Sequence, residues 1–248
     1  MSNKHSSAII LAAGLGSRLR PLTDNTPKCL VNFLGKPIIV RMIEQLSLIE
    51  VKNITIVCGY CSEVLQNYCG KKLAGIDINY IENKDFASTN SMYSLWLARN
   101  ELSKGCYLIE GDTVCDQGLF TSLSNLNPDN SYWAGQPYYG NIDGCVLTVE
   151  PQTMRIAKLE IERNPIPGPK QNQFKSTGIL SLSADYGKTL SIWLDVDVEI
   201  GNVNLYYDLI IGKHLIDKSI HIYNIASEPW FEIDSVDDLI KAEQIFQK

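Results

Sequence analysis

Short apolar segments alternate with stretches of helical periodicity through the first half of the chain. The apolar segments cover residues 8–12, 54–57, 76–81 and 107–109. Continuous apolar character indicates strands buried on both faces, as in a parallel sheet, because half-exposed strands alternate apolar and polar residues. The pattern therefore predicts a doubly wound α/β fold with a mixed, mainly parallel sheet.

Helix-start signals lie between these strands. A helix is expected to open at Pro37, because the missing N–H of proline costs nothing in the first turn. The residues that follow place apolar side chains on one face of this helix. A short helix is expected from residue 62. Another is predicted over residues 91–102, and its cap is one of three residues: Ser88, Thr89 or Asn90.

The pattern changes after Pro128 to shorter alternating segments, which predict hairpins in a smaller β-rich region. An exposed loop is expected over residues 164–170, which are rich in proline and glycine. The predicted elements of this part are strands over 146–149, 155–161, 178–182 and 220–225, and helices around Leu190, over 203–216 and after a capping box formed by Ser235 and Asp238. We expect one domain over residues 1–248, because nothing near residue 130 resembles a flexible linker.

Composition narrows the class of protein. The 248 residues are 45% apolar and carry 22 Lys and Arg against 28 Asp and Glu, a net charge of −6. This balance argues against a nucleic-acid partner. No segment reaches the roughly 18 consecutive apolar residues of a membrane span, so no membrane partner is expected. Seven cysteines without framework spacing predict reduced thiols and a cytoplasmic protein.

A glycine-rich loop follows the first strand. Gly14 and Gly16 let the backbone approach an anion closely, and Arg18 offers a planar cation. The dinucleotide fingerprint is not met, because its third glycine would fall at Leu19, and the Gly-Lys-Ser/Thr of a P-loop is absent. The loop therefore predicts a phosphate site of another kind, with a plain tight turn as the alternative.

Downstream motifs complete a longer pattern. Thr26-Pro27-Lys28 and Gly35-Lys36-Pro37 follow the loop, and the whole segment resembles the nucleotidyltransferase superfamily, with its sugar-phosphate nucleotidyltransferase fold, that makes nucleoside-diphosphate sugars and CDP-alcohols. The resemblance implies that residues 1–127 form a nucleotide-binding half and residues 128–248 an acceptor-binding half. It also implies catalytic roles for Lys28 and Arg18. The implied nucleotide-binding residues are Leu11, Ala13, Gly14, Gly16, Ser17, Gly59, Tyr60, Asn83, Asn90 and Ser91.

Two aspartates are candidates for a metal site. Asp112 follows the strand over 107–109, and Asp234 precedes the last helix. Carboxylates at the carboxyl ends of strands suit Mg²⁺, with phosphates and water completing its shell. Both aspartates match the superfamily pattern, so Mg²⁺ is the implied cofactor; a turn residue and a helix cap are the alternatives.

This assignment predicts a simple reaction. A phosphomonoester is largely dianionic at neutral pH, because its second pKa is about 6, so its oxygen can attack the α-phosphorus without a general base. The predicted catalysis is in-line positioning and charge neutralisation, with release of pyrophosphate.

The nucleotide and acceptor follow from a second resemblance. Asn90-Ser91-x-Tyr93-Ser94-Leu95 resembles the phosphocholine cytidylyltransferase type used to decorate bacterial surface polymers. It implies CTP as nucleotide and a phosphocholine-like acceptor, with a CDP-alcohol as product. The runner-up reactions are sugar-1-phosphate nucleotidyl transfer from UTP, dTTP or CTP, and cytidylyl transfer to aminoethylphosphonate.

A cationic head group needs π faces or carboxylates around it. The candidate acceptor contacts are Trp133, Asp195, Tyr206, Tyr207 and Asp208. Core packing of the aromatic residues and a solvated acidic loop are the alternatives. The cation for the acceptor phosphate stays open among three residues: Lys158, Arg163 and Lys175.

Other classes of protein compete with an enzyme of this kind. Cys58-Gly59-Tyr60-Cys61 follows a strand, as a thioredoxin-like redox pair does, but that function leaves Lys28 and the two aspartates unexplained. A nucleotide-sensing subunit without activity would be expected to lose one of these residues. The oligomeric state stays open.

Overall fold

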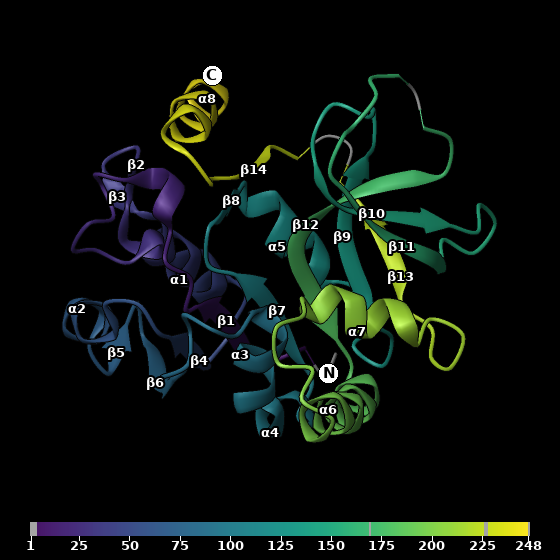
Figure 1. Cartoon of the computed structure of the whole chain (residues 1–248), viewed down its shortest axis with the longest axis horizontal. Helices are drawn as coiled ribbons and strands as arrows, with labels where there is room; N and C mark the ends of the chain where they lie inside the picture. The colour runs from purple at the N-terminus through teal and green to yellow at the C-terminus, as the bar shows by residue number, and fades with distance from the viewer. Residues whose placement is uncertain (1–3, 169, 226–227, 248) are drawn as a thin grey trace.

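The computed structural model describes residues 4–168, 170–225 and 228–247. Over these residues a ten-stranded mixed sheet runs in the order β11-β10-β12-β7-β1-β4-β6-β5, with β9 beside β12 and β13 beside β9 (Figure 1). The strands are β1 (Ser7–Ala12), β4 (Asn53–Cys58), β5 (Lys72–Leu73), β6 (Ile76–Glu82), β7 (Cys106–Glu110), β9 (Tyr132–Pro137), β10 (Gly144–Val149), β11 (Ile156–Glu162), β12 (Gln173–Leu182) and β13 (His221–Asn224). The central strands β7, β1, β4 and β6 are parallel, and β12 joins β7 in antiparallel pairing.

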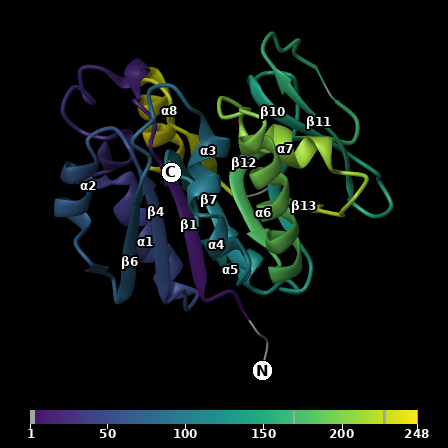
Figure 2. The same ribbon diagram turned by 60° about the horizontal axis from the view of Figure 1, so that its bottom comes forward.

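Helices cover both faces of this sheet (Figure 2). They are α1 (Ile38–Leu48), α2 (Ser62–Cys69), α3 (Ser91–Leu97), α4 (Arg99–Leu102), α5 (Gln117–Ser124), α6 (Ala184–Glu199), α7 (Tyr207–Lys213) and α8 (Val236–Phe246). Helices α1, α2 and α5 pack on one face with Ile10 of β1, and α3, α4, α6 and α7 pack on the other with Ile9. The predicted doubly wound α/β class is confirmed.

Two short ribbons complete the fold. β8 (Thr113–Cys115) pairs with β14 (Trp230–Glu232), and β2 (Asn32–Phe33) pairs with β3 (Lys36–Pro37). The first ribbon brings the end of the chain back to the first half, where α8 packs over Leu19 and Phe33 (Figure 1). The carboxyl ends of β7 and β14 therefore lie near the loop that follows β1.

Most predicted elements are confirmed, and their caps explain the boundaries. Pro37 precedes α1, the side chain of Asn90 caps α3, and Ser235 and Asp238 form the capping box of α8. The helix predicted over residues 203–216 is wrong at its start: α7 begins at Tyr207, because backbone carbonyls of residues 203 and 205 accept hydrogen bonds from the first turn of α3.

The seven cysteines, all within the described residues, are free thiols. None of the described helices is long and apolar enough to cross a membrane.

Candidate active site

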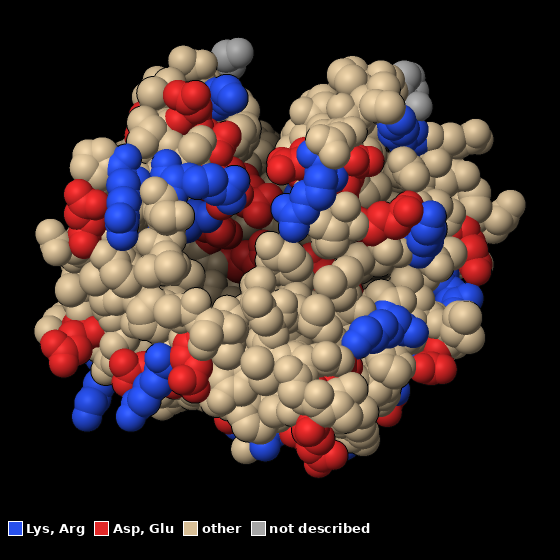
Figure 3. Space-filling view, in the orientation of Figure 1, with Lys and Arg blue, Asp and Glu red and all other residues tan. Residues whose placement is uncertain are grey.

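A cavity of about 340 Å³ opens where the loop after β1 faces the second half of the molecule. Figure 3 shows the hollow, with acidic side chains in its floor and basic side chains on either side. A second space of about 470 Å³ beside it is lined by Gly14, Ser17, Arg18 and Lys28, among other residues. The cavity therefore has an acidic centre and cationic edges, a distribution that suits a metal ion flanked by phosphate groups.

The glycine loop is shaped by its contact with the segment that carries Lys28. Gly16 has a left-handed φ of 61°, and a Cβ there would lie 3.0 Å from Cβ of Lys28. Thr23 Oγ1 donates a hydrogen bond of 2.8 Å to the carbonyl of Gly16. Leu11, Ala13 and Gly14 line the main cavity. The loop thus places backbone and Lys28 on the same wall of the site.

Gly59 and Tyr60 support this loop from behind and lie outside the cavity lining. A Cβ on Gly59 would come within 2.7 Å of the Ala13 carbonyl oxygen, and Tyr60 N–H donates to that oxygen at 3.2 Å. The Tyr60 hydroxyl donates to the carbonyl of Asp24. The structure therefore does not support direct nucleotide contacts for Gly59 and Tyr60, because both donors of Tyr60 are used within the fold and Gly59 packs against the Ala13 carbonyl.

Lys28 lies between the two predicted metal ligands. Its Nζ is 2.5 Å from Asp112 Oδ2 and 2.5 Å from Asp234 Oδ1. Arg18 approaches the other oxygen of Asp234, with Nη2 at 2.9 Å from Oδ2. Four side chains that are distant in sequence thus meet at one point, beside the glycine loop.

The charges in this cluster stabilise one another. Burial alone would lower the pKa of Lys28, but Asp112 and Asp234 outweigh it and raise the pKa above its ordinary value. Burial raises the pKa of Asp234, while Lys28 and Arg18 lower it, and the net direction is down. Lys28 is therefore a permanent cation at neutral pH, suited to neutralising phosphate charge and unsuited to accepting a proton.

The carboxylates fit a divalent cation. Asp112 Oδ1 is buried without a hydrogen-bond partner among the described residues, so it has a free lone pair. One oxygen each of Glu110, Asp112 and Glu232 lie within 4.8 Å of one another. Oxygen donors on separate strands match the preference of Mg²⁺, which keeps waters and substrate phosphates in its shell.

Asn83, Asn90 and Ser91, which were predicted to bind the nucleotide, line the cavity. The buried amide of Asn83 donates to Thr89 Oγ1 at 3.0 Å and to Ser94 Oγ at 3.1 Å. Asn90 Oδ1 accepts the N–H of Ser91 at 2.8 Å and caps α3. These residues thus form a turn and a helix cap, and they also line the cavity.

The opposite end of the cavity is built from α7 and β12. Asp208 in the first turn of α7 is only 7% exposed, and burial raises its pKa to about 6. Tyr206 lies at the rim, with the guanidinium of Arg163 5.9 Å from its ring centre. Lys175, only 4% exposed, lines the cavity with its Nζ 3.4 Å from Glu232 Oε2.

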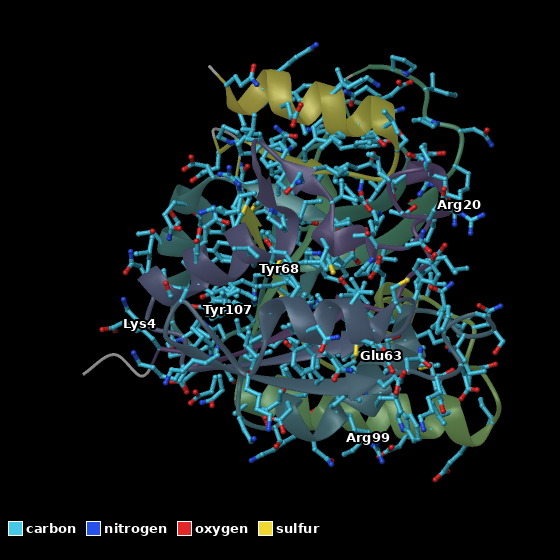
Figure 4. All side chains as sticks on the ribbon, turned by 90° about the vertical axis from the view of Figure 1, so that its left-hand side faces the viewer. Lys4, Arg20, Glu63, Tyr68, Arg99 and Tyr107 are labelled. Atoms are coloured by element: carbon cyan, nitrogen blue, oxygen red, sulfur yellow. The ribbon has the colours of Figure 1, made fainter. Side chains whose placement is uncertain are left out.

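Three predicted acceptor contacts do not reach this cavity. Trp133 is fully buried and donates from Nε1 to Ser176 Oγ, and Tyr207 is fully buried behind Glu110, to which its hydroxyl donates at 3.0 Å. Asp195 accepts a 2.7 Å ion-pair contact from Arg99 Nε. Figure 4 shows Arg99 on the α6 side of the molecule, well separated from Arg20 near the glycine loop. The structure therefore corrects these assignments: Trp133 and Tyr207 are core residues, and Asp195 belongs to another surface.

The choice of acceptor-phosphate cation also narrows. Lys158 pairs with Glu160 at 2.7 Å on β11, with both side chains more than half exposed, and lies outside the cavity lining. Arg163 and Lys175 both line the cavity. Lys175 is the better candidate, because its buried ammonium has lost most of its water and gains more from an anionic partner.

The cysteine pair lacks the properties of a redox site. Burial raises the pKa of Cys58, and Glu82 raises it further. A reactive thiol needs the opposite shift, because the thiolate is the nucleophile.

The sequence arguments missed Glu110, Glu232 and Phe86, which line the cavity with the predicted residues. A signal for the two glutamates exists, since Glu110 stands two positions before Asp112 and Glu232 two before Asp234. Each glutamate is the last residue of its strand, β7 or β14, and the aspartate follows just beyond the strand end. No local pattern marks Phe86.

Comparisons with known proteins agree with this geometry. The family model of nucleotidyl transferases matches residues 7–134. A 2-aminoethylphosphonate cytidylyltransferase from Lancefieldella rimae is 27% identical, covering 94% of this chain and 90% of that protein. A choline-phosphate cytidylyltransferase from Haemophilus influenzae is 30% identical and covers 94% of each. The solved structure of CTP:phosphocholine cytidylyltransferase from Streptococcus pneumoniae has a TM-score of 0.82 and 27% identity, covering 97% of this chain and 98% of that one.

Proposed function

The chain belongs to the nucleotidyl transferase family and is a nucleotidyltransferase of the choline-phosphate cytidylyltransferase type, and from this premise we propose its reaction. It transfers the cytidylyl group of CTP to a small phosphorylated amino alcohol, giving a CDP-alcohol and pyrophosphate. The observation that carries the proposal is Lys28, held 2.5 Å from both Asp112 and Asp234 beside the glycine loop.

The residues of the site divide the work of an in-line displacement. An oxygen of the acceptor phosphate attacks the α-phosphorus of CTP and forms the new P–O bond. The bond from the α-phosphorus to the bridging oxygen breaks, and pyrophosphate leaves with the electron pair. Lys28 and Arg18 offset the charge that gathers on the phosphate oxygens, and the backbone of the glycine loop supplies N–H donors. No general base is required, because the acceptor phosphate is already ionised.

Asp112 and Asp234 would hold Mg²⁺, which neutralises triphosphate charge when bound. The unpartnered Asp112 Oδ1 supports this assignment. At the acceptor end, Lys175 holds the acceptor phosphate and Asp208 faces the cationic head group. A role in decorating surface polysaccharide is consistent with such a product. We propose the cytoplasm as the compartment, and the free thiols of the chain support it.

The proposal is tested by following CTP consumption with phosphocholine and phosphoethanolamine, in Mg²⁺ and after its removal with EDTA. Asp112→Asn and Asp234→Asn should each lower kcat/KM by about 100-fold or more, because each removes a carboxylate from the cation site. Asp237→Asn is a matched control, since Asp237 is exposed three positions from Asp234. Mg²⁺-independent turnover, or full activity in both aspartate variants, would contradict the assignment.

A further inference from the structure

The acceptor end of the cavity is lined by two carboxyl groups, those of Asp208 and Glu110, and one oxygen of Asp208 is not used. Asp208 is 7% exposed, and its Oδ1 has no hydrogen-bond partner among the described residues. Glu110 lies beside it on the cavity wall, held by the hydroxyl of Tyr207 at 3.0 Å. Gly178 leaves room for Glu110, because a Cβ at position 178 would lie 2.7 Å from Glu110 Oε2. The chain thus keeps one buried, unpartnered carboxylate oxygen, with a second carboxyl group beside it, at the end of the cavity proposed for the acceptor head group.

Aromatic faces are scarce at the same place. Phe86 and Tyr206 are the aromatic residues among the described residues that line the cavity. Phe86 packs against Tyr60 beneath the glycine loop, with ring centres 6.2 Å apart. The ring of Tyr206, at the rim, already has the guanidinium of Arg163 near its face. Trp133 is stacked in the core against Tyr207.

These two features favour one kind of cation over another. A trimethylammonium group has no N–H, so π faces attract it and a carboxylate attracts it by charge alone, without a hydrogen bond. A primary ammonium has three N–H donors and needs oxygen acceptors. A buried carboxylate oxygen without a partner is costly, and a ligand that brings an N–H donor satisfies it with a hydrogen bond, which a trimethylammonium group cannot do.

We infer that the acceptor of this enzyme carries a primary ammonium, whose N–H groups donate hydrogen bonds to Asp208 and Glu110. Its anionic phosphate or phosphonate is held by Lys175. This inference rests on the proposed cytidylyl transfer and names the substrate class of the same site: a phosphorylated primary amino alcohol or an aminoalkylphosphonate. Phosphocholine is then a poor acceptor, although the site accommodates a cation.

The charges along the cavity match such a zwitterion. Lys175 lies on β12 and contacts Glu232, so its ammonium is on the side of the metal carboxylates, where the attacking phosphate must be. Asp208 lies on α7, and together with Lys175 it lines the same cavity. The two charges are close enough for Lys175 to lower the pKa of Asp208 against the effect of burial. The acceptor would therefore be held by a contact of its phosphate with Lys175 and a contact of its ammonium with Asp208, with the phosphate directed toward Asp112 and Asp234.

A methylation series tests the inference directly. Phosphoethanolamine, its N-methyl and N,N-dimethyl derivatives and phosphocholine are offered with CTP and Mg²⁺, and pyrophosphate release is measured. We expect kcat/KM to fall with each methyl group and by about 100-fold or more over the series, because each methyl removes a donor that the buried carboxylates require. 2-Aminoethylphosphonate is included to separate a phosphate from a phosphonate source.

The outcomes distinguish the two levels of the proposal. Phosphocholine turnover equal to or better than phosphoethanolamine turnover overturns the primary-ammonium inference and leaves cytidylyl transfer intact. If CTP is not consumed with any of these acceptors, the proposed function itself is overturned.

A variant assigns the effect to Asp208. Asp208→Asn should raise the KM for phosphoethanolamine at least tenfold, leave the KM for CTP unchanged, and flatten the methylation series. Asp129→Asn is the control, since Asp129 is exposed in a loop of the second half. An unchanged series in Asp208→Asn would refute the contact between Asp208 and the ammonium.

Discussion

Replacing Lys28 with alanine removes the cation that separates two carboxylates at the centre of the site. In the structure its Nζ contacts Asp112 and Asp234, both at 2.5 Å, and its side chain is only 14% exposed. Loss of one preorganised, desolvated charge that stabilises a transition state costs about 3 kcal/mol, which lowers kcat/KM by about 100-fold. The assay is pyrophosphate release at a fixed Mg²⁺ concentration, with folding checked by circular dichroism.

The same substitution has a second signature, in stability. Without Lys28, Asp112 and Asp234 face each other without the ammonium between them, so the free energy of unfolding at neutral pH should fall. Mg²⁺ should restore it more strongly in Lys28→Ala than in the wild type, because the cation takes the place of the lost ammonium.

Lys36→Ala is the matched control, since Lys36 forms an ion pair with Glu44 at the surface. It should change neither turnover nor the Mg²⁺ dependence of stability. A folded Lys28→Ala protein with near-native turnover would refute the assigned role of this lysine.

Three further predictions concern the acceptor end, the glycine loop and the cysteines. Burial raises the pKa of Asp208 to about 6, so this carboxylate destabilises the folded state as pH rises from about 4 to 6. Asp208→Asn should gain about 3 kcal/mol in urea unfolding at pH 7, and the gain should vanish below pH 4. Gly59→Ala should raise the KM for CTP about tenfold or more, because a Cβ 2.7 Å from the Ala13 carbonyl oxygen displaces the loop; an unchanged KM would show that the loop tolerates the shift. The double substitution Cys58→Ser with Cys61→Ser should leave turnover within twofold, and a large loss would revive a role for these thiols.

Local signals in the sequence predicted the helix starts well. A proline, a cap or a capping box acts within one turn, so Pro37, Asn90 and Ser235 each gave a correct boundary. The pairing of β8 with β14 was missed because it joins residues 113–115 to 230–232, and neither segment carries a periodic pattern long enough to read. The start of α7 was wrong for the same reason, since a contact with α3 decides it.

The site divides in a similar way. Lys28, Asp112 and Asp234 could be singled out because each stands in a motif, and the structure brings them together. Trp133 could not be placed from its type alone, because an aromatic residue on a strand suits a core and a binding site equally well. Whether an oxygen of Asp208 has a hydrogen-bond partner depends on the packing of α7, β10 and β12, and no sequence pattern predicts it.

The central claim is tested most directly by one matrix of substrates. Pyrophosphate release is measured with Mg²⁺ for CTP, UTP, dTTP and GTP against phosphoethanolamine, 2-aminoethylphosphonate, phosphocholine and glucose-1-phosphate. We predict pyrophosphate release with CTP and the amine-bearing acceptors, at the highest rate for acceptors with a primary ammonium. Cytidylyl transfer to an amine-bearing acceptor would be contradicted if glucose-1-phosphate reacted with UTP or dTTP while no amine-bearing acceptor reacted with CTP.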